Sequence, residues 1–356
     1  MQPQRIEPDQ SPLRSISVLM LVGSPVDFFR ADLSRVYAKG FLDVFHDLAD
    51  YRIEIAYVSP DGSWRFPRSL DEVDTAAAQP VSLSDAVSYI EARQHDIMIP
   101  EMFCRPGMTT YRSLFDLLGI PHLGNRADVM AMTADKHLAR AVVAAAGVAV
   151  PAGEVLRAGE KYTGNMPVVV KPADSDNSMG VSLVREEADM ALAIDDALLY
   201  SESVIVETYV PLGREVRCGI IVREGELVCL PLEEYAVDER EHPIRARADK
   251  LERTADGELY LVAKESTKAW IVDVDDPVTE AVWAAARRCH IALGCRHYSL
   301  FDFRIDPAGV PWFLEAGLYC SYSPSSVISV MAAAAGIGVD ELLEMGLQEI
   351  AREKAR

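Results

Sequence analysis

Short apolar runs and amphipathic stretches alternate along the first third of the chain. The pattern predicts strands at Ile16–Val22, Arg52–Val58 and Asp96–Pro100, and helices at Ala31–Leu48 and Ser84–Ala92. Because strands and helices alternate, we expect a parallel α/β domain over residues 15–125. Residues 1–14 are polar and predict a disordered leader.

The remainder of the chain combines helices with hairpins. Apolar spacing predicts helices at Ala127–Met132, Asp135–Ala146, Asp276–Leu293 and Ser325–Ala355, strands at Pro167–Lys171, Val181–Val184, His297–Ile305 and Val310–Leu314, and a β-rich segment at Val204–Leu232. We expect a central α+β subdomain at 126–210 and a C-terminal α+β domain at 211–356. Residues 233–266 are highly charged without clear periodicity, which favours an exposed loop.

Composition limits the classes of function. The chain has 356 residues, 49% of them hydrophobic, which is enough for two or three packed domains. A formal charge of −20 disfavours nucleic acid and anionic membranes as partners, so an anionic substrate would need a local cationic pocket. The six cysteines show no CxxC pair, and no apolar run approaches the ~18 residues of a membrane span. We expect reduced thiols and a cytoplasmic protein.

A lysine at the end of an apolar strand is the first candidate for chemistry. Lys171 ends the Pro167–Lys171 strand and is followed by a small polar loop that contains Ser178 and reaches Gly180. A lysine so placed can meet a phosphate as a point charge, while loop amides and hydroxyls cover the phosphoryl oxygens. An ordinary hairpin with a solvated lysine is the alternative.

Two acids inside apolar strands form the second candidate. Strict alternation places Asp302 and Arg304 on one face of their strand, and Phe313 and Glu315 on one face of the next. The turn at residues 306–309 would bring the two acids together. Buried carboxylates need a compensating cation, so the pair predicts a Mg²⁺ site. A salt bridge between Asp302 and Arg304 is the alternative.

A third, weaker candidate follows the strand that begins at Val204. Glu207 stands at the end of this strand, and Glu215 lies beyond a Pro/Gly turn. Carboxylates in such positions can accept hydrogen bonds from an adenine amino group or from ribose hydroxyls. Surface acids after a strand are common, so the sequence alone leaves this open.

Taken in order, these segments resemble the ATP-grasp superfamily, and most closely the D-alanine–D-alanine ligases, from Pro100 to about Gly336. The resemblance implies an ATP-grasp fold: an N-terminal parallel α/β domain, a central lid domain and a C-terminal α+β domain. It implies ATP and Mg²⁺ as cofactors, with Mn²⁺ able to substitute. The roles it implies are phosphate binding for Lys136, Lys171 and Ser178, nucleotide recognition for Glu207, Val210 and Glu215, and metal binding for Asp302 and Glu315.

The chain also departs from the family pattern. Gly317 stands where the family has a metal-binding asparagine, and Leu300 replaces an arginine that steadies the tetrahedral intermediate. Arg304 is the expected substitute, so Arg304, Lys171 and Ser178 are the predicted catalytic residues. The region that helps to form the D-alanine pocket is replaced by Glu101–Gly107.

These features predict an ATP-dependent carboxylate–amine ligase that forms an amide through an acylphosphate. Because the changes gather on the substrate side, we expect an amino acid or small carboxylate of specialised metabolism and an amine as substrates. An authentic D-alanine–D-alanine ligase is one alternative, and a non-catalytic ATP-binding regulatory module is another. By analogy with the family, Arg245, Arg247 and Lys250 belong to a candidate lid, and a homodimer is expected.

Overall fold

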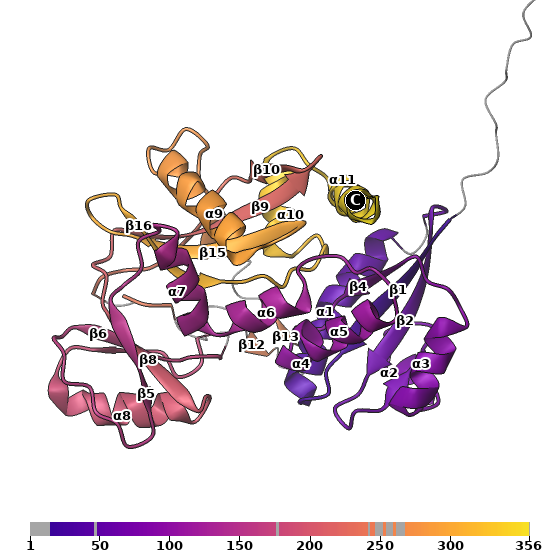
Figure 1. The fold of residues 1–356 in the computed structure, drawn as a ribbon, viewed down its shortest axis with the longest axis horizontal. Coiled ribbons are helices and arrows are strands. Elements are labelled where there is room, and N and C mark those ends of the chain that lie inside the picture. Colours follow the sequence, from indigo (N-terminus) through magenta and orange to yellow (C-terminus); the bar gives the residue numbers. More distant parts are fainter. Residues whose placement is uncertain are drawn as a thin grey trace, which may run out of the picture.

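The computed structural model describes residues 15–45, 48–175, 178–240, 243–245, 252–253, 259–260 and 268–355. Three larger sheets with flanking helices, and one two-stranded sheet, organise this part of the chain (Figure 1). The N-terminal, central and C-terminal sheets come from successive stretches of sequence. The predicted mixed α/β class is confirmed, whereas the exact domain boundaries stay predictions.

The N-terminal sheet has the order β3-β2-β1-β4. Its strands are β1 (Ile16–Gly23), β2 (Tyr51–Val58), β3 (Trp64–Arg65) and β4 (Ile97–Pro100). The accompanying helices are α1 (Phe28–Phe45), α2 (Glu72–Ala77), α3 (Leu83–Glu91), α4 (Arg105–Met108) and α5 (Thr110–Leu117). Strands β2, β1 and β4 are parallel, as predicted. β1 is almost wholly buried, which explains its unbroken apolar run.

The central sheet has the order β5-β8-β6-β7, and its paired strands are antiparallel. Its elements are β5 (Gly153–Arg157), β6 (Val168–Pro172), β7 (Ser182–Val184), α8 (Glu187–Leu198) and β8 (Ser203–Thr208). Helix α8 packs its apolar residues against this sheet. Helices α6 (Ala127–Ala134) and α7 (Lys136–Ala145) instead pack into the core of the C-terminal sheet.

The C-terminal sheet has the order β14-β11-β9-β15-β16, and β10 pairs with β9. Its strands are β9 (Arg214–Arg223), β10 (Glu226–Cys229), β11 (Glu233–Tyr235), β14 (Ala269–Ile271), β15 (Tyr298–Ile305) and β16 (Pro311–Ala316). The helices are α9 (Thr279–Leu293), α10 (Val327–Ala334) and α11 (Val339–Lys354), and β12 (Glu252–Arg253) pairs with β13 (Leu259–Tyr260). One core joins α7 and α9 to this sheet, and a second core joins α10 and α11 to it and to the N-terminal domain.

The prediction of an exposed loop at residues 233–266 is wrong at its start. Residues 233–235 form β11, which pairs with β9 and β14, and Glu233 is buried. The Tyr235 hydroxyl donates a 2.5 Å hydrogen bond to Glu233, so the buried carboxylate is satisfied. A three-residue strand is too short to show periodicity. Of the candidate lid, Arg247 and Lys250 lie outside the described residues.

Candidate functional site

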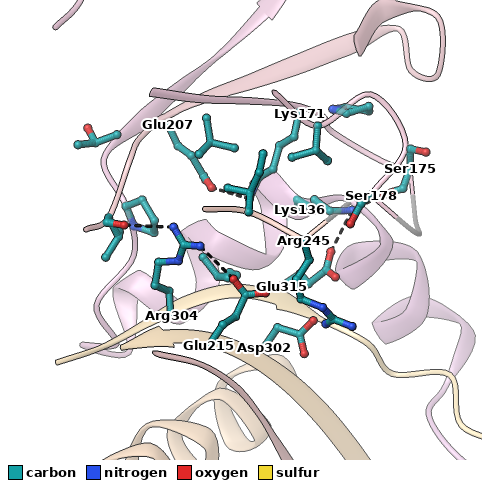
Figure 2. Close-up of a pocket in the computed structure, with 18 residues that line it drawn as sticks. Lys136, Lys171, Ser175, Ser178, Glu207, Glu215, Arg245, Asp302, Arg304 and Glu315 are labelled. Atoms are coloured by element: carbon teal, nitrogen blue, oxygen red, sulfur yellow. Dashed lines mark hydrogen bonds and ion pairs between the residues drawn. The ribbon is translucent and has the colours of Figure 1, made fainter. Parts of the chain in front are cut away.

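A cleft between the central sheet and the C-terminal sheet encloses about 790 Å³ of empty space when its opening to solvent is included, and is here called the cavity. Its charged lining residues are Lys136, Lys171, Glu207, Glu215, Arg245, Asp302, Arg304 and Glu315. Figure 2 shows Lys171 and Glu207 on the central-sheet side, facing Asp302 and Glu215 from β15 and β9. The structure therefore brings together every site residue predicted from the sequence, since Ser178 and Val210 also line the cavity.

Two lysines reach the cavity from different elements. Lys136 begins α7, where the Asp135 side chain caps the helix by accepting from the amides of residues 137 and 138. Its Nζ donates to the Ser175 carbonyl and lies 3.4 Å from Glu315 Oε2. Lys171 projects from β6 and donates to Glu207 Oε1 at 2.6 Å. Both are buried, so an anion placed between them would be little screened.

Arg140 does not line the cavity, but it supports Glu207, which does, and sequence reasoning missed it. Its Nη1 lies 3.2 Å from Glu207 Oε2, an ion pair without good hydrogen-bond geometry. Arg140 stands four residues after Lys136 on α7, so the two share a helix face. The four-residue spacing would have predicted that Arg140 lies near the site, once Lys136 had been predicted to bind phosphate.

Arg304 is held at the Glu215 end of the cavity. Its Nη2 donates to Glu215 at 3.1 Å and to the Pro243 carbonyl, and its Nη1 donates to the Val210 carbonyl at 3.2 Å. The predicted alternative, a salt bridge between Arg304 and Asp302, is therefore not the one that forms. Asp302 instead pairs with Arg217 of β9, whose Nη2 donates to Oδ2 at 2.6 Å.

Asp302 and Glu315 face each other across the β15–β16 hairpin, as predicted. The expectation that Phe313 shares the face of Glu315 is wrong. A register shift pairs Phe303 with Phe313 in the core, whereas Leu314 and Glu315 both line the cavity. Such a bulge turns the strand locally and re-aims the carboxylate.

The two carboxylates fit a Mg²⁺ ion that completes its shell with substrate oxygens. Mg²⁺ is commonly held by one or two carboxylates together with phosphates and water. Among the described residues no group of three or more His, Cys, Asp or Glu side chains could hold a metal alone, and Gly317 adds no ligand. Asp302 and Glu315 would therefore hold Mg²⁺ only together with a nucleotide.

The net charge of the site also suits a nucleotide. Four basic and four acidic side chains line the cavity, and Arg140 and Arg217 add two positive charges by pairing with two of those acids. The surplus of about two positive charges matches the roughly doubly negative complex of ATP with Mg²⁺.

The region that the family resemblance assigns to the substrates, here called the substrate side, contains a buried acid that lacks a full set of partners and does not line the cavity. Glu101 follows β4, is buried, and its Oε2 has no hydrogen-bond partner in the described structure. Burial raises the pKa of this carboxyl to about 8, against the lowering effects of Ser321 and Arg112. Nothing in the local sequence distinguishes Glu101 from a surface acid, so only the fold reveals it.

Aromatic side chains line the same side. The Phe103 ring centroid lies 5.4 Å from that of Tyr37 and 6.0 Å from that of Tyr319. These residues come from α1, from the segment after β4 and from the segment after β16. An aromatic cluster thus joins the N-terminal domain to the C-terminal domain beside residues 101–107.

This fold and this site define an ATP-dependent carboxylate–amine ligase. The sequence profile described as "D-ala D-ala ligase C-terminus" matches residues 147–348. A D-alanine–D-alanine ligase of Citrifermentans bemidjiense is 30% identical over 241 residues, 67% of this chain and 72% of that protein. The chain therefore belongs to the D-alanine–D-alanine ligase family, whose members are ATP-grasp enzymes that form a carbon–nitrogen bond using ATP and Mg²⁺.

Solved structures support the fold. The VanG D-Ala:D-Ser ligase of Enterococcus faecalis has a TM-score of 0.75 at 20% identity, covering 95% of this chain and 100% of that chain. A D-alanine–D-alanine ligase of Bacillus anthracis, solved with ATP, has a TM-score of 0.67 at 18% identity, covering 95% of this chain and 100% of that chain. The expected ATP-grasp fold is confirmed.

Proposed function

We propose that this ligase joins two amino acids or close analogues, with D-alanine as the first donor to test. The carrying observation is the single cavity that places Lys136 and Lys171 opposite Asp302 and Glu315. The family relatives favour D-alanine–D-alanine ligation over a substrate of specialised metabolism. Family membership also favours an enzyme over a non-catalytic regulatory module.

The reaction has two steps. An oxygen of the donor carboxylate attacks the γ-phosphorus of ATP, the bond to the β-phosphate oxygen breaks, and ADP leaves. The amine nitrogen of the acceptor then attacks the acyl carbon, phosphate leaves, and the nitrogen loses a proton. Lys136 and Lys171 would hold the phosphoryl oxygens, and Glu207 and Glu215 would orient the nucleoside. Mg²⁺ bound at Asp302 and Glu315 would neutralise phosphate charge.

A second candidate is a ligase for another acid and amine. Three observations favour it: Leu300 is packed in an apolar core, Gly317 offers no side chain, and Glu101 presents an incompletely paired carboxylate. A buried acid of this kind can receive a cationic group of a substrate. Substrate identity separates this candidate from D-alanine ligation.

The setting of the enzyme is also a proposal. In the described part of the chain no helix is long and apolar enough to cross a membrane. All six cysteines are free, in keeping with a reducing compartment. We infer a cytoplasmic enzyme, and a homodimer by analogy with other ligases.

An ADP-release screen tests the function. Purified protein with ATP and Mg²⁺ is offered D-alanine alone, then pairs of amino acids and small carboxylates, with mass spectrometry of each product. Glu315→Ala should abolish substrate-dependent ADP release, while Glu280→Ala, an exposed acid on α9, should not. Full turnover by Glu315→Ala would overturn the metal assignment. ATP binding without ADP release across the whole panel would overturn ligation.

A further inference from the structure

Among the described residues, Arg217 is the guanidinium that pairs with Asp302, one of the two carboxylates predicted to bind the metal. Nε and Nη2 of Arg217 each donate to a different oxygen of Asp302, the second at 2.6 Å. Arg217 and Asp302 are also register partners on the paired strands β9 and β15. A two-pronged contact of this kind uses one lone pair on each oxygen of Asp302 and places a positive charge beside the carboxylate, so Arg217 and Mg²⁺ compete electrostatically for it.

The other guanidinium groups that line the cavity are engaged elsewhere, and Arg245 stacks on Tyr235, with its guanidinium carbon 3.4 Å from the ring centroid. Leu300 faces Gly219 across the strands and belongs to the apolar core with Leu230 and Met331, so it is part of a packed interior. Arg304 is fixed by Glu215 and by two backbone carbonyls. The predicted catalytic role of Arg304 therefore competes with three contacts that hold it at the other end of the cavity.

The neighbours of Arg217 can stabilise its guanidinium group when Asp302 binds Mg²⁺. Its guanidinium carbon lies 5.6 Å from the Tyr235 ring centroid, and Glu233, the hydrogen-bond partner of Tyr235, is buried beside this ring. Tyr235 and Glu233 therefore give the guanidinium an aromatic and an acidic neighbour that remain in place when Mg²⁺ binds Asp302.

We propose that Arg217 is a further catalytic residue: it neutralises Asp302 in the free enzyme and, once Asp302 binds Mg²⁺, turns to hold the anionic oxygen of the donor carboxylate or acylphosphate. The exchange conserves charge pairing, because Arg217 loses one carboxylate partner and gains the anion that the donor brings. This inference rests on the proposed ligase reaction, and it names Arg217 as the group that binds the donor carboxylate.

The test separates metal binding from chemistry. Mn²⁺ binding to the enzyme with a non-hydrolysable ATP analogue is followed by electron paramagnetic resonance, which requires neither acid nor amine. In Arg217→Gln, Asp302 is freed of its competitor, so Mn²⁺ should bind about tenfold more tightly. Substrate-dependent ADP release should fall by roughly 10²-fold to 10³-fold, as for loss of an oxyanion donor. The two readouts move in opposite directions.

Two further variants keep the test sound if Arg217→Gln folds poorly. Arg217→Lys retains the charge but not the forked geometry, so it should show a smaller change of the same sign in both readouts. Arg214→Gln is the matched control, because Arg214 lies on the same strand but pairs with Glu234 and Asp276. It should leave both readouts unchanged.

The outcomes divide cleanly. Tighter Mn²⁺ binding together with a kcat loss in either Arg217 variant supports the proposal. Weaker or unchanged Mn²⁺ binding would show that Arg217 only orients Asp302, and unchanged turnover would show that it holds no reacting group; each overturns the proposal. If no acid–amine pair supports ADP release even in the unmodified enzyme, the ligase function fails, while the Mn²⁺ arm still judges the competition for Asp302.

Discussion

The cavity and the neighbouring region around Glu101 and Phe103 are built differently. In the cavity, buried acids are held in ion pairs: Lys171 with Glu207, and Arg304 with Glu215. Around Phe103, aromatic rings take the place of such pairs. Both regions contain a buried carboxylate with one oxygen that makes no hydrogen bond, Glu207 in the cavity and Glu101 beside it. The ion pairs preform a charged site for an anion, whereas the aromatic region offers apolar surface.

The contrast also separates what relatives share from what this chain changes. The residues predicted to bind phosphate, and two of the predicted metal ligands, keep the family pattern expected from the resemblance, whereas Gly317, Leu300 and residues 101–107 depart from it. ATP chemistry constrains the first set, because phosphate charge must be met by cations and carboxylate-bound metal. The second set can vary with the substrate.

The largest effect is expected when the predicted metal ligand Glu315 is changed. Glu315→Gln removes a metal-binding charge while keeping the shape of the side chain, so substrate-dependent kcat should fall by about 10³-fold or more. Steady-state ADP release measures this, with circular dichroism as the check on folding. Glu280→Gln, an exposed glutamate on α9, serves as the control. A loss below tenfold would argue that Glu315 carries no metal.

The next effect sharpens the phosphate assignment. Lys171→Met should lower kcat/KM for ATP by about 10²-fold, because a charge-assisted contact to phosphate is lost. Arg140 remains beside Glu207 and limits the loss of stability. Kinetics at varied ATP, beside Lys161→Met at an exposed position, provides the measurement. An unchanged kcat/KM would return Lys171 to a structural role.

A smaller effect probes the substrate side through pH. The pKa of Glu101 is raised from 4.5 to about 8 by burial, so the folded state binds the proton more tightly than the unfolded state. The contribution of Glu101 to the free energy of unfolding should therefore be largest below pH 4.5. It should decline between pH 4.5 and pH 8, by up to about 1.4 kcal/mol per pH unit. Glu101→Gln should flatten this decline in denaturant titrations without altering ADP binding. The same slope in Glu101→Gln and in the exposed control Glu91→Gln would refute the assignment.

The smallest effect concerns the phosphate loop. Ser178→Ala should raise KM for ATP by roughly threefold to tenfold, with little change in kcat. This is the loss of binding expected when one neutral hydrogen bond is removed. Ser178 has φ of +56°, and alanine meets the same backbone strain as serine there, so folding should be little affected. ATP saturation curves measure it against Ser84→Ala, an exposed helix position. A KM equal to that control would place the hydroxyl outside the nucleotide contacts.

Much of the fold followed from local patterns. Unbroken apolar runs predicted β1 and β4, and helical spacing predicted α1 and α9, because period and burial are properties of neighbouring residues. β11 was missed, since three residues carry no period and Glu233 looks like a surface acid until Tyr235 is seen to bond it.

The sequence by itself determined the list of charged residues predicted to bind ATP and the metal, because their order along the chain carries the family pattern, and the structure brings them into one cavity. Only the tertiary structure decided which charges pair. The register of β9 and β15 pairs Asp302 with Arg217 and Arg304 with Glu215. A bulge in β16 places Glu315 on a different face from Phe313. These outcomes depend on neighbours far apart in sequence, and a shift of one residue in register sends a side chain to the opposite face.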